Sequence, residues 1–577
     1  MWSPQSGKGR AVRSLGVVAV AIATAVGSVM TATGAAAEDA ARQAPAGASE
    51  EYVVAFTGTP EEAAAAIQAA GGAVQSVTGG VGVALVSSSD SAFLDKVRAR
   101  GEIRGAARNH SVGTARPGQP HRFAQERPSA DERAAAGIGQ GSHPRRPDAE
   151  PLADLQWDME QIGATADGAH RQATGRGVDV GILDTGIDGR HPDLAPNFDA
   201  ARSRNFTTDI PAIDGPCEVV GCVDPADVDH NGHGTHVAGI VGAASNDFGI
   251  AGVAPEATLV NLRAGQDSGF FFLYETVAAL VYAADIGLDV VNMSFFTDPW
   301  LYNCASREDY LEGTVTDEEI AQQRLTRELV LAAVAYAHRH GVTLVGSAGN
   351  EHQDLAAPTR FDAISPDFPP ESARPRTVAN TCLVLPNEAP QVIGVSALGP
   401  STTKADYSNY GFRDVEISAP GGWFRDFVGT PAFQTPENLV LSSYPLDVAI
   451  ATGLADENGV PVDEFSVRYC DDQGVCGFYT YLQGTSMASP HVAGAAALAI
   501  EAHGRSTRDG GRALDPDAVA RILLTTATDH ACPAGGVEVY TDEGRTPDFN
   551  AVCEGTTDVN GLYGEGIVDA AAAVRGR

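Results

Sequence analysis

Short apolar segments alternate with helical segments over most of the chain, and this alternation restricts the fold more than any other feature. We predict strands at 178–183, 258–262, 289–293, 342–346 and 391–396, and helices at 233–244, 272–286, 325–340, 486–503 and 516–527. Strands that are apolar on both faces and are joined by helices form a mostly parallel sheet that is covered on both sides. From residue 151 onward we therefore expect an α/β domain, with a mostly parallel sheet flanked by helices on both faces.

A smaller unit precedes this domain, with a core at 51–109. Residues 51–57 alternate between apolar and polar side chains, as a half-buried strand does. Thr59-Pro60-Glu61-Glu62 has the capping residue, first-turn proline and acidic residues that begin a helix. Further elements are predicted as strands at 73–77 and 81–87, a helix at 91–100 and a strand near Ile103. This β-α-β-β-α-β order is typical of a small ferredoxin-like α+β sandwich.

The first 37 residues have the order of a secretory signal. Lys8, Arg10 and Arg13 precede an apolar run, and Ala35-Ala36-Ala37 forms an A-x-A cleavage site. A membrane anchor is the alternative, but Thr, Gly and Ser interrupt the run, and a span needs about 20 apolar residues. We therefore expect residues 1–37 to be removed on export, and the rest to be extracellular without membrane attachment.

Residues 113–150 are rich in Pro, Arg, Gly, Gln and Ser and contain few large apolar residues. Such a segment cannot bury enough surface to fold by itself, so we interpret it as an exposed linker that is processed. The expected domain plan is a signal peptide at 1–37, a second unit at 38–112, the linker at 113–150 and a large domain at 151–577.

Acidic residues outnumber basic ones, with 74 Asp and Glu against 39 Lys and Arg and a formal net charge of -35. A field of this sign repels nucleic-acid phosphates and anionic membrane surfaces, so we expect neither as a partner. Carboxylates are also the natural ligands of calcium. An acidic surface needs no ligand to exist, however, and a solvated surface is the simpler interpretation.

Eight cysteines fit an oxidising compartment. The absence of Cys-x-x-Cys disfavours a zinc ribbon or a thioredoxin-like motif. Four of the cysteines are spaced for small-loop disulfides and the other four for longer ones. The expected pairs are Cys217 with Cys222, Cys470 with Cys476, Cys532 with Cys553, and Cys304 with Cys382. The sequence alone does not fix this pairing.

Three segments of the large domain carry reactive polar residues in settings that a purely structural role explains poorly. Asp184 ends an apolar strand in Val180-Gly-Ile-Leu-Asp-Thr-Gly-Ile-Asp188, where a buried carboxylate is costly without a partner. His233 lies in a glycine-rich turn into a helix, His230-Asn-Gly-His-Gly-Thr-His-Val-Ala-Gly239. Ser486 stands at the start of a helix, in Gly484-Thr-Ser-Met-Ala-Ser-Pro-His-Val-Ala-Gly494.

These segments resemble the signature motifs of subtilisin-like serine proteases, in the family's chain order Asp, His, Ser. The resemblance implies a serine endopeptidase in which Ser486 is the nucleophile, His233 the general base and Asp184 the residue that orients His233. It also implies that Asn350, in Ser347-Ala-Gly-Asn350, donates to the oxyanion of the intermediate. It covers about residues 155–573, with insertions near 297–326, 351–390 and 421–483.

Each of these residues, taken alone, would more often be structural, and it is their conjunction that favours catalysis. His236 follows His233 by three residues, but a helical zinc protease needs His-Glu-x-x-His. We therefore interpret His236 as a packing or hydrogen-bonding residue of its helix. Asp188, Ser489 and His491 are interpreted as supporting scaffold.

In the family, the substrate lies extended and pairs as a strand with two enzyme segments. The matching positions are Asp267-Ser268-Gly269 and Ser294-Phe295-Phe296. Phe296 replaces the glycine that the family usually has. A bulky side chain there would narrow the cleft or displace the wall of the first pocket, so the cleavage preference stays open.

The resemblance also suggests a structural calcium ion. In the family, an Asp after the first motif and a loop before Gly-Val-Ala-Pro hold the ion, and Asp193 and the loop 245–250 occupy those places. Asn246 and backbone carbonyls would be the other ligands. An uncharged surface turn is the competing interpretation. No organic cofactor is expected.

Residues 51–109 resemble the family's inhibitory propeptide, which would assist folding and then occupy the cleft as a product-like strand. A permanent accessory domain is the alternative. The implied partners are protein or peptide substrates and the chain's own propeptide, and we expect a monomer. Two other functions stay open: a catalytically silent subtilisin-like binding module, and a maturation protease that cuts one partner.

Overall fold

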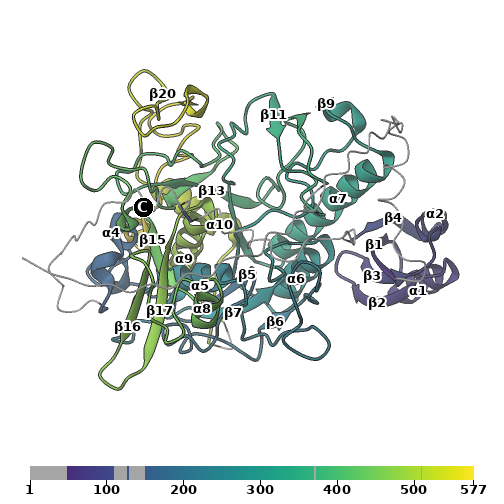
Figure 1. Cartoon of the computed structure of the whole chain (residues 1–577), viewed down its shortest axis with the longest axis horizontal. Coiled ribbons are helices and arrows are strands. Elements are labelled where there is room, and N and C mark those ends of the chain that lie inside the picture. The colour runs from purple at the N-terminus through teal and green to yellow at the C-terminus, as the bar shows by residue number, and fades with distance from the viewer. Residues whose placement is uncertain (1–48, 110–126, 129–149, 370–371, 508–509, 577) are drawn as a thin grey trace, which may run out of the picture. The chain divides into compact units, whose positions relative to one another are not determined.

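The computed structural model describes residues 49–109, 127–128, 150–369, 372–507 and 510–576 (Figure 1). The expected signal peptide at 1–37, and all but three residues of the expected linker at 113–150, lie outside these ranges. None of the helices in the described part combines the length and hydropathy that a membrane crossing would need.

Seven strands form the central sheet of the large domain, in the order β14-β13-β10-β8-β5-β7-β6, and every neighbouring pair is parallel. The strands are β5 (Asp179–Leu183), β6 (Arg204–Asn205), β7 (Thr258–Arg263), β8 (Val290–Met293), β10 (Thr343–Ser347), β13 (Val392–Leu398) and β14 (Ile417–Pro420). All five strands predicted from apolar runs are present, so the predicted α/β class is confirmed.

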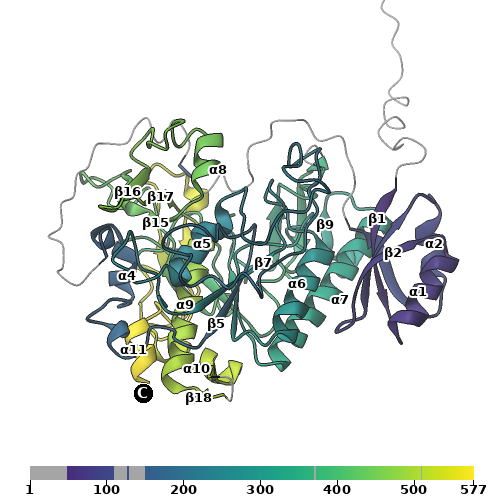
Figure 2. The same cartoon turned by 90° about the horizontal axis from the view of Figure 1, so that it is seen from below.

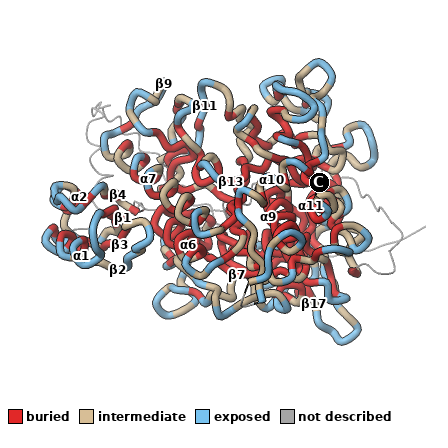
Figure 3. The backbone as a smooth tube through the Cα atoms, turned by 180° about the vertical axis from the view of Figure 1, so that it is seen from behind, coloured by how far each residue is buried: buried red, intermediate tan, exposed pale blue. Residues whose placement is uncertain are grey.

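Helices cover both faces of this sheet (Figures 1 and 2). One face packs against α5 (His233–Gly242), α9 (Thr485–His503), α10 (Pro516–Thr526) and α11 (Ala570–Arg575). The other packs against α6 (Leu273–Asp285) and α7 (Asp317–Arg339). Adjacent strand residues point to opposite faces, because Val290 belongs to the first hydrophobic cluster and Val291 to the second. Figure 3 shows this buried interior in red.

Helix α7 begins eight residues before the predicted start at 325. Thr316 and Glu319 form a capping box there, with Glu319 N donating to Thr316 Oγ1 at 3.2 Å. This is a sequence signal for a helix start that the apolar pattern alone does not reveal.

The smaller unit contains β1 (Glu50–Phe56), α1 (Pro60–Ala69), β2 (Ala73–Thr78), β3 (Val83–Ser88), α2 (Phe93–Arg98) and β4 (Ile103–Arg108). Its antiparallel sheet has the order β2-β3-β1-β4, so the predicted order of elements is confirmed. Thr59 caps α1 in a capping box with Glu62.

Two small antiparallel sheets lie within the predicted insertions. The first contains β9 (Tyr310–Glu312), β11 (Thr359–Asp362) and β12 (Arg376–Ala379), and the second β15 (Val440–Ser443), β16 (Ser466–Cys470) and β17 (Cys476–Leu482). The remaining short elements are α4 (Trp157–Gln161), α8 (Leu446–Ala451), β18 (Arg505–Ser506), β19 (Arg512–Ala513), β20 (Val537–Glu538) and β21 (Ala551–Val552).

All four expected disulfides are present, and they join Cys217 to Cys222, Cys304 to Cys382, Cys470 to Cys476, and Cys532 to Cys553.

Candidate active site

Asp184 and His233 meet at the carboxyl end of the central sheet. Asp184 directly follows β5 and is fully buried, and His233 is the first residue of α5. Asp184 Oδ1 lies 2.7 Å from His233 Nδ1 and also accepts a hydrogen bond from Thr185 N at 2.8 Å. Burial raises the pKa of Asp184, and the charge and hydrogen bond of His233 oppose this shift. A neutral imidazole held in this way carries its proton on Nδ1 and presents Nε2 as a base.

Asp229 holds the turn that leads into α5. Its carboxylate accepts hydrogen bonds from Thr185 Oγ1, Asn231 N, Gly232 N, and the N and Oγ1 of Thr235. Gly232 has a φ of 100°, and a Cβ there would lie 2.4 Å from the Tyr444 ring. Only glycine fits this position. Sequence reasoning missed Asp229, although an Asp just before a helix is a common capping residue.

Ser486 lies at the start of α9 and is buried, and its Oγ is 3.3 Å from the backbone oxygen of Ser294. Ser294 directly follows β8, which pairs with β5. The carboxyl ends of parallel neighbours meet at one edge of a sheet, and α9 packs against α5. One edge therefore gathers Asp184, His233 and Ser486 from three distant parts of the sequence.

Asn350 lies after β10, and its side chain is fixed by Thr485. Asn350 Oδ1 accepts hydrogen bonds from the N and Oγ1 of Thr485, both at 2.9 Å. Gly349 N donates to Thr485 Oγ1 at 3.0 Å. This turns the amide Nδ2, the donor, away from Thr485. Thr485 is therefore a positioning residue that sequence reasoning passed over.

The predicted substrate segments use their polar side chains within the protein. Ser268 donates from both N and Oγ to Asp214 Oδ1, at 2.9 and 2.6 Å, and Gly269 N donates to the Gln266 oxygen at 2.8 Å. Ser294 Oγ donates to the Ser486 backbone oxygen at 3.0 Å. The side chains of Ser268 and Ser294 thus hold their own segments in place.

The two phenylalanines of the second segment point into different clusters. Phe295 stacks on Phe271, with ring centroids 4.0 Å apart, whereas Phe296 packs against the buried group around Leu301 and Tyr302. Asp298 ties the same two segments together, because its Oδ2 accepts from Phe271 N at 2.5 Å. The aromatic pair and this hydrogen bond connect the segment after β7 to the segment after β8.

Asp193 is buried beside the loop predicted to bind calcium. Its Oδ2 accepts from Tyr479 Oη at 2.7 Å and from Ile250 N at 3.1 Å, whereas Oδ1 has no hydrogen-bond donor among the described residues. Burial raises the pKa of Asp193 to about 8, with the charge of Glu150 adding to the shift. Asn246 is exposed, and its Oδ1 accepts from Phe248 N at 3.1 Å.

Negative charge gathers beside the turn that carries His233. The Asp267 carboxylate is the main cause that raises the pKa of His230 to about 9, and the charge of Asp224 adds to it. Burial raises the pKa of Asp209 to about 7, together with the charges of Asp267 and Asp224. Sequence reasoning missed this group, because its members lie in different segments.

The other polar residues of the motifs have partners inside the protein. His236 is fully buried, its Nε2 lies 3.0 Å from the Thr480 oxygen, and burial lowers its pKa to about 3. His491 is also fully buried, with Nδ1 2.8 Å from the Met487 oxygen and Nε2 3.0 Å from Asp158 Oδ2. Both ring nitrogens of His491 therefore face acceptors.

Comparison with known proteins matches residues 175–564 to the subtilase family. Fervidolysin from Fervidobacterium pennivorans is 28% identical over 359 residues, a match that covers 61% of this chain and 38% of fervidolysin. Thermitase from Thermoactinomyces vulgaris is 28% identical over 340 residues, which cover 58% of this chain and 78% of thermitase. The chain thus spans well under half the length of fervidolysin.

Solved structures agree on the fold. A crystal structure of the epidermin leader peptide processing serine protease from Staphylococcus aureus superposes with a TM-score of 0.58 at 20% identity, covering 92% of this chain and 98% of that one. The fervidolysin crystal structure superposes with a TM-score of 0.53 at 21% identity, covering 93% of this chain and 62% of that one. Since the family match spans most of the chain, the protein belongs to the subtilase family and is a serine-type peptidase.

Proposed function

We propose that this subtilase is a secreted endopeptidase, made as a zymogen, that cuts peptide bonds through an acyl-enzyme on Ser486. The observation that carries the proposal is the 2.7 Å contact between buried Asp184 Oδ1 and His233 Nδ1, at the sheet edge where Ser486 lies in the first turn of α9. A buried carboxylate–imidazole pair beside a helix N-terminal serine is the arrangement that activates a hydroxyl for acyl transfer.

In the first half-reaction, Ser486 Oγ bonds to the carbonyl carbon of the substrate while its proton moves to His233 Nε2. Asp184 stays ionised and stabilises the imidazolium. The Asn350 amide and the Ser486 N–H, at the positive end of α9, stabilise the oxyanion. His233 then gives the proton to the leaving amine as the C–N bond breaks. Loss of one oxyanion donor costs about 3 kcal/mol of transition-state stabilisation.

In the second half-reaction, water replaces the amine. His233 Nε2 takes a proton from the water, whose oxygen bonds to the acyl carbon, and returns that proton to Ser486 Oγ as the ester bond breaks. The carboxylic acid product leaves, and Ser486 and His233 are restored. No metal ion or organic cofactor takes part in either step.

The zymogen assignment rests on contacts between the smaller unit and the helices α6 and α7. Val53, Ala55, Val83 and Ala107 belong to the same hydrophobic cluster as these helices. Asn109 Nδ2 donates to both carboxylate oxygens of Glu275 at 3.1 Å. An apolar docking face of this kind supports an inhibitor that is released after a cut in the linker.

The domain plan proposed from the sequence follows the same logic. Residues 1–37 direct export, 38–112 form the propeptide, 113–150 are cut, and 151–577 are the extracellular peptidase, which acts as a monomer on proteins or peptides. The four disulfides support an oxidising destination.

Subtilases commonly bind structural calcium, and we assign Asp193 as a ligand in this chain. Buried Asp193 Oδ1, and Oε2 of nearby Glu150, have no hydrogen-bond donor among the described residues. Such oxygens suit a hard cation. Carbonyls of the loop 245–250 complete the set, with Asn246 at its rim. The ion would stabilise the loop and has no part in the chemistry.

A serine-directed fluorophosphonate tests the nucleophile. We expect one label on Ser486 of the processed enzyme, no label in Ser486→Ala, and an unchanged label in Ser489→Ala, whose serine lies one turn further along α9. Casein hydrolysis by Ser486→Ala should fall at least about 10⁴-fold. Retained hydrolysis in Ser486→Ala, or a label elsewhere, would contradict the assignment.

A further inference from the structure

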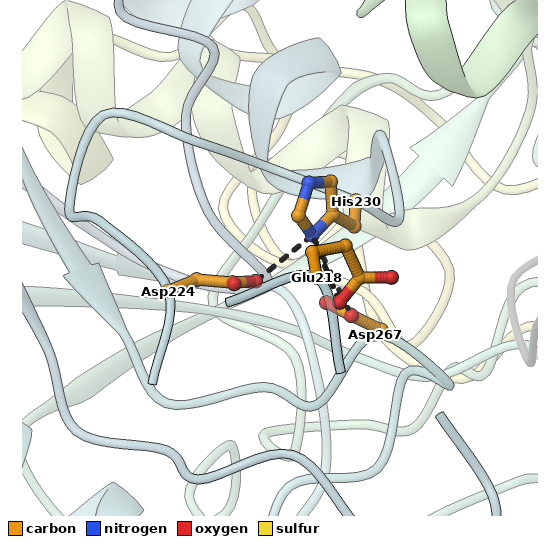
Figure 4. Close-up of side chains that lie close together, drawn as sticks. All are labelled: Glu218, Asp224, His230 and Asp267. Atoms are coloured by element: carbon orange, nitrogen blue, oxygen red, sulfur yellow. Dashed lines mark ion pairs between the residues drawn. The ribbon is translucent and has the colours of Figure 1, made fainter. Parts of the chain in front are cut away.

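Four side chains with metal-ligand atoms converge beside the turn that carries His233 (Figure 4). Glu218 lies in the loop closed by Cys217 and Cys222, Asp224 follows that loop, His230 precedes His233 by three residues, and Asp267 follows β7. One ligand atom of each residue lies within 4.8 Å of the other three. We refer to Glu218, Asp224, His230 and Asp267 as the acidic cluster.

The distances in the acidic cluster are compatible with ligands around a common centre. His230 Nδ1 lies 2.8 Å from Asp224 Oδ2, 3.6 Å from Asp267 Oδ2 and 4.0 Å from Glu218 Oε2. The contact with Asp224 lacks the alignment of a hydrogen bond. Tetrahedral ligands about 2.1 Å from an ion are about 3.4 Å apart, which lies within this range. In Figure 4 the same ring nitrogen of His230 faces all three carboxylates.

Buried acceptor oxygens provide independent evidence for a cation. Asp224 Oδ1 is buried and has no hydrogen-bond donor among the described residues. Neighbouring Asp209 is only 4% exposed, and neither of its carboxylate oxygens accepts a hydrogen bond in that part of the chain. Buried carboxylates without donors are costly unless a positive charge offsets them. These buried acceptors therefore favour a cation beside them.

Arg263 supplies one positive charge to this group and His230, which pairs with three of the carboxylates, supplies a second, so the two only partly balance four carboxylates. The fully buried guanidinium of Arg263 lies 2.8 Å from Asp224 Oδ2, 2.5 Å from Asp267 Oδ1 and 3.7 Å from Asp209 Oδ1. Three carboxylates thus share a single guanidinium, and Glu218 adds a fourth negative charge nearby. Arg263 also donates to an oxygen of each ligating aspartate, and outer hydrogen bonds of this kind orient metal ligands.

We propose that the acidic cluster binds one divalent ion, and that this ion is zinc rather than calcium. One imidazole nitrogen with three carboxylates is a donor set for zinc, which takes four ligands of mixed nitrogen and oxygen type. Calcium instead takes six to eight oxygens and no nitrogen. Glu218 is exposed, which gives the ion a route from solvent. The site is separate from the Asp193 loop.

The ion would join three segments, in addition to the contacts that Arg263 and hydrogen bonds already make among them. These segments are the loop 217–222, the turn before His233 and the substrate segment that starts at Asp267. Zinc binding should therefore stiffen the substrate segment, so that its removal raises KM more than it lowers kcat. This consequence rests on the proposed function, whereas zinc binding itself does not.

The test uses the full chain with Ser486→Ala, which prevents self-cleavage, after removal of metals by a chelator. Calcium is added first, to saturate other sites, and zinc chloride is then titrated by calorimetry. We expect one zinc ion per chain and a rise of several degrees in the melting temperature. Cobalt in place of zinc should give absorption bands of a four-coordinate site with a nitrogen ligand.

Two variants and a matched control locate the ion. Glu218→Gln, at an exposed position that should not disturb folding, should weaken zinc binding at least about tenfold, and His230→Gln about 100-fold or more. Asp227→Asn removes the same charge nine residues further along the chain, outside the acidic cluster, and should leave the affinity unchanged. Absence of zinc binding to the calcium-saturated protein would overturn the proposal. Equal zinc affinity in Glu218→Gln and the control would overturn it as well.

Discussion

The small sheet of the N-terminal unit and the central sheet both bury one face against α6 and α7, but they differ in what covers the other face. Helices α5 and α9, which carry His233 and Ser486, cover the second face of the central sheet. The short helices α1 and α2 cover the second face of the small sheet. The central sheet therefore shares its core with the helices of the candidate active site, whereas the small unit has a core of its own on that side.

Strand β1 shows this division residue by residue. Val54 belongs to the core that the small unit makes with α1 and α2, and its neighbour Val53 belongs to the cluster of α6 and α7. Side chains of successive strand residues point to opposite faces, so one strand serves two interfaces. Alternate residues of β1 thus serve different purposes: one set packs into the unit's own core, and the other packs against α6 and α7.

The largest effect is expected from Val53→Asp in the Ser486→Ala chain. A carboxylate at this fully buried site has no partner and should weaken docking by about 4 kcal/mol or more. Hydrogen exchange should then rise in α6 and α7 while α1 stays protected. Gln75→Asp, at an exposed position of β2, serves as the control. Unchanged hydrogen exchange in α6 would show that Val53 does not hold the small unit against this helix.

Val54→Ala tests the other interface of β1, the core that the small unit forms with α1 and α2. It should lower the stability of the unit's own core, so protection should fall in α1 as well as in α6. If Val53→Asp and Val54→Ala gave the same pattern, folding and docking would be one process.

A smaller effect is expected from Asn109→Ala. Asn109 is buried, and it donates to Glu275 and accepts from Tyr274 N at 3.1 Å. Loss of these bonds leaves the Glu275 carboxylate with fewer donors and should weaken docking by about 2 kcal/mol, or roughly 30-fold. Arg98→Ala breaks a half-exposed ion pair with Glu318 and should cost less than about 1 kcal/mol. Exchange at the start of α6 measures both, and equal losses would contradict this ranking.

The last prediction concerns the pH dependence of stability and compares the lysines of the two regions. Lys404 of the large domain is fully buried, and burial lowers its pKa to about 7, with Asp406 and Glu538 opposing the shift. Lys96, the single lysine at 50–109, has a half-exposed side chain. Above pH 7 the unfolded chain keeps the proton that folded Lys404 releases, so stability should rise with pH up to about 10.5.

Denaturant unfolding at pH 7 and pH 9 checks this expectation. The gain in unfolding free energy should be roughly 1 to 2 kcal/mol larger in the parent chain than in Lys404→Met. Lys96→Met should gain as much unfolding free energy between pH 7 and pH 9 as the parent chain does. An equal gain in the parent chain and in Lys404→Met would show that Lys404 keeps its proton when buried.

The elements that the sequence predicts well are those whose signals are local. Apolar runs located five of the seven strands of the central sheet, and the capping residues around Thr59 located α1. The disulfides pair as expected, although the sequence alone left the pairing open. Helix α7 shows the limit of the apolar pattern, because its first turns are polar and are marked only by the Thr316 capping box.

The parts that could not be predicted depend on contacts between distant residues. His491 Nε2 lies 3.0 Å from Oδ2 of Asp158, which is 333 positions away in the sequence. The residues around His491 and Asp158 give no sequence signal for this pair. The acidic cluster likewise combines Asp267 with the segment 218–230, which only the sheet brings together. The Asp-His-Ser motifs were recognised because each motif is long. The sequence did not show that the three residues lie close together in the folded protein.

All eight cysteines lie between positions 217 and 553, so no sulfur bridge ties the small unit to the large domain. If the small unit is the proposed propeptide, one cut between the two would leave it held by noncovalent contacts alone, and its rate of dissociation would set when proteolysis begins. With the proposed export, dilution would make this activation effectively irreversible, because a released unit would rarely meet its enzyme again.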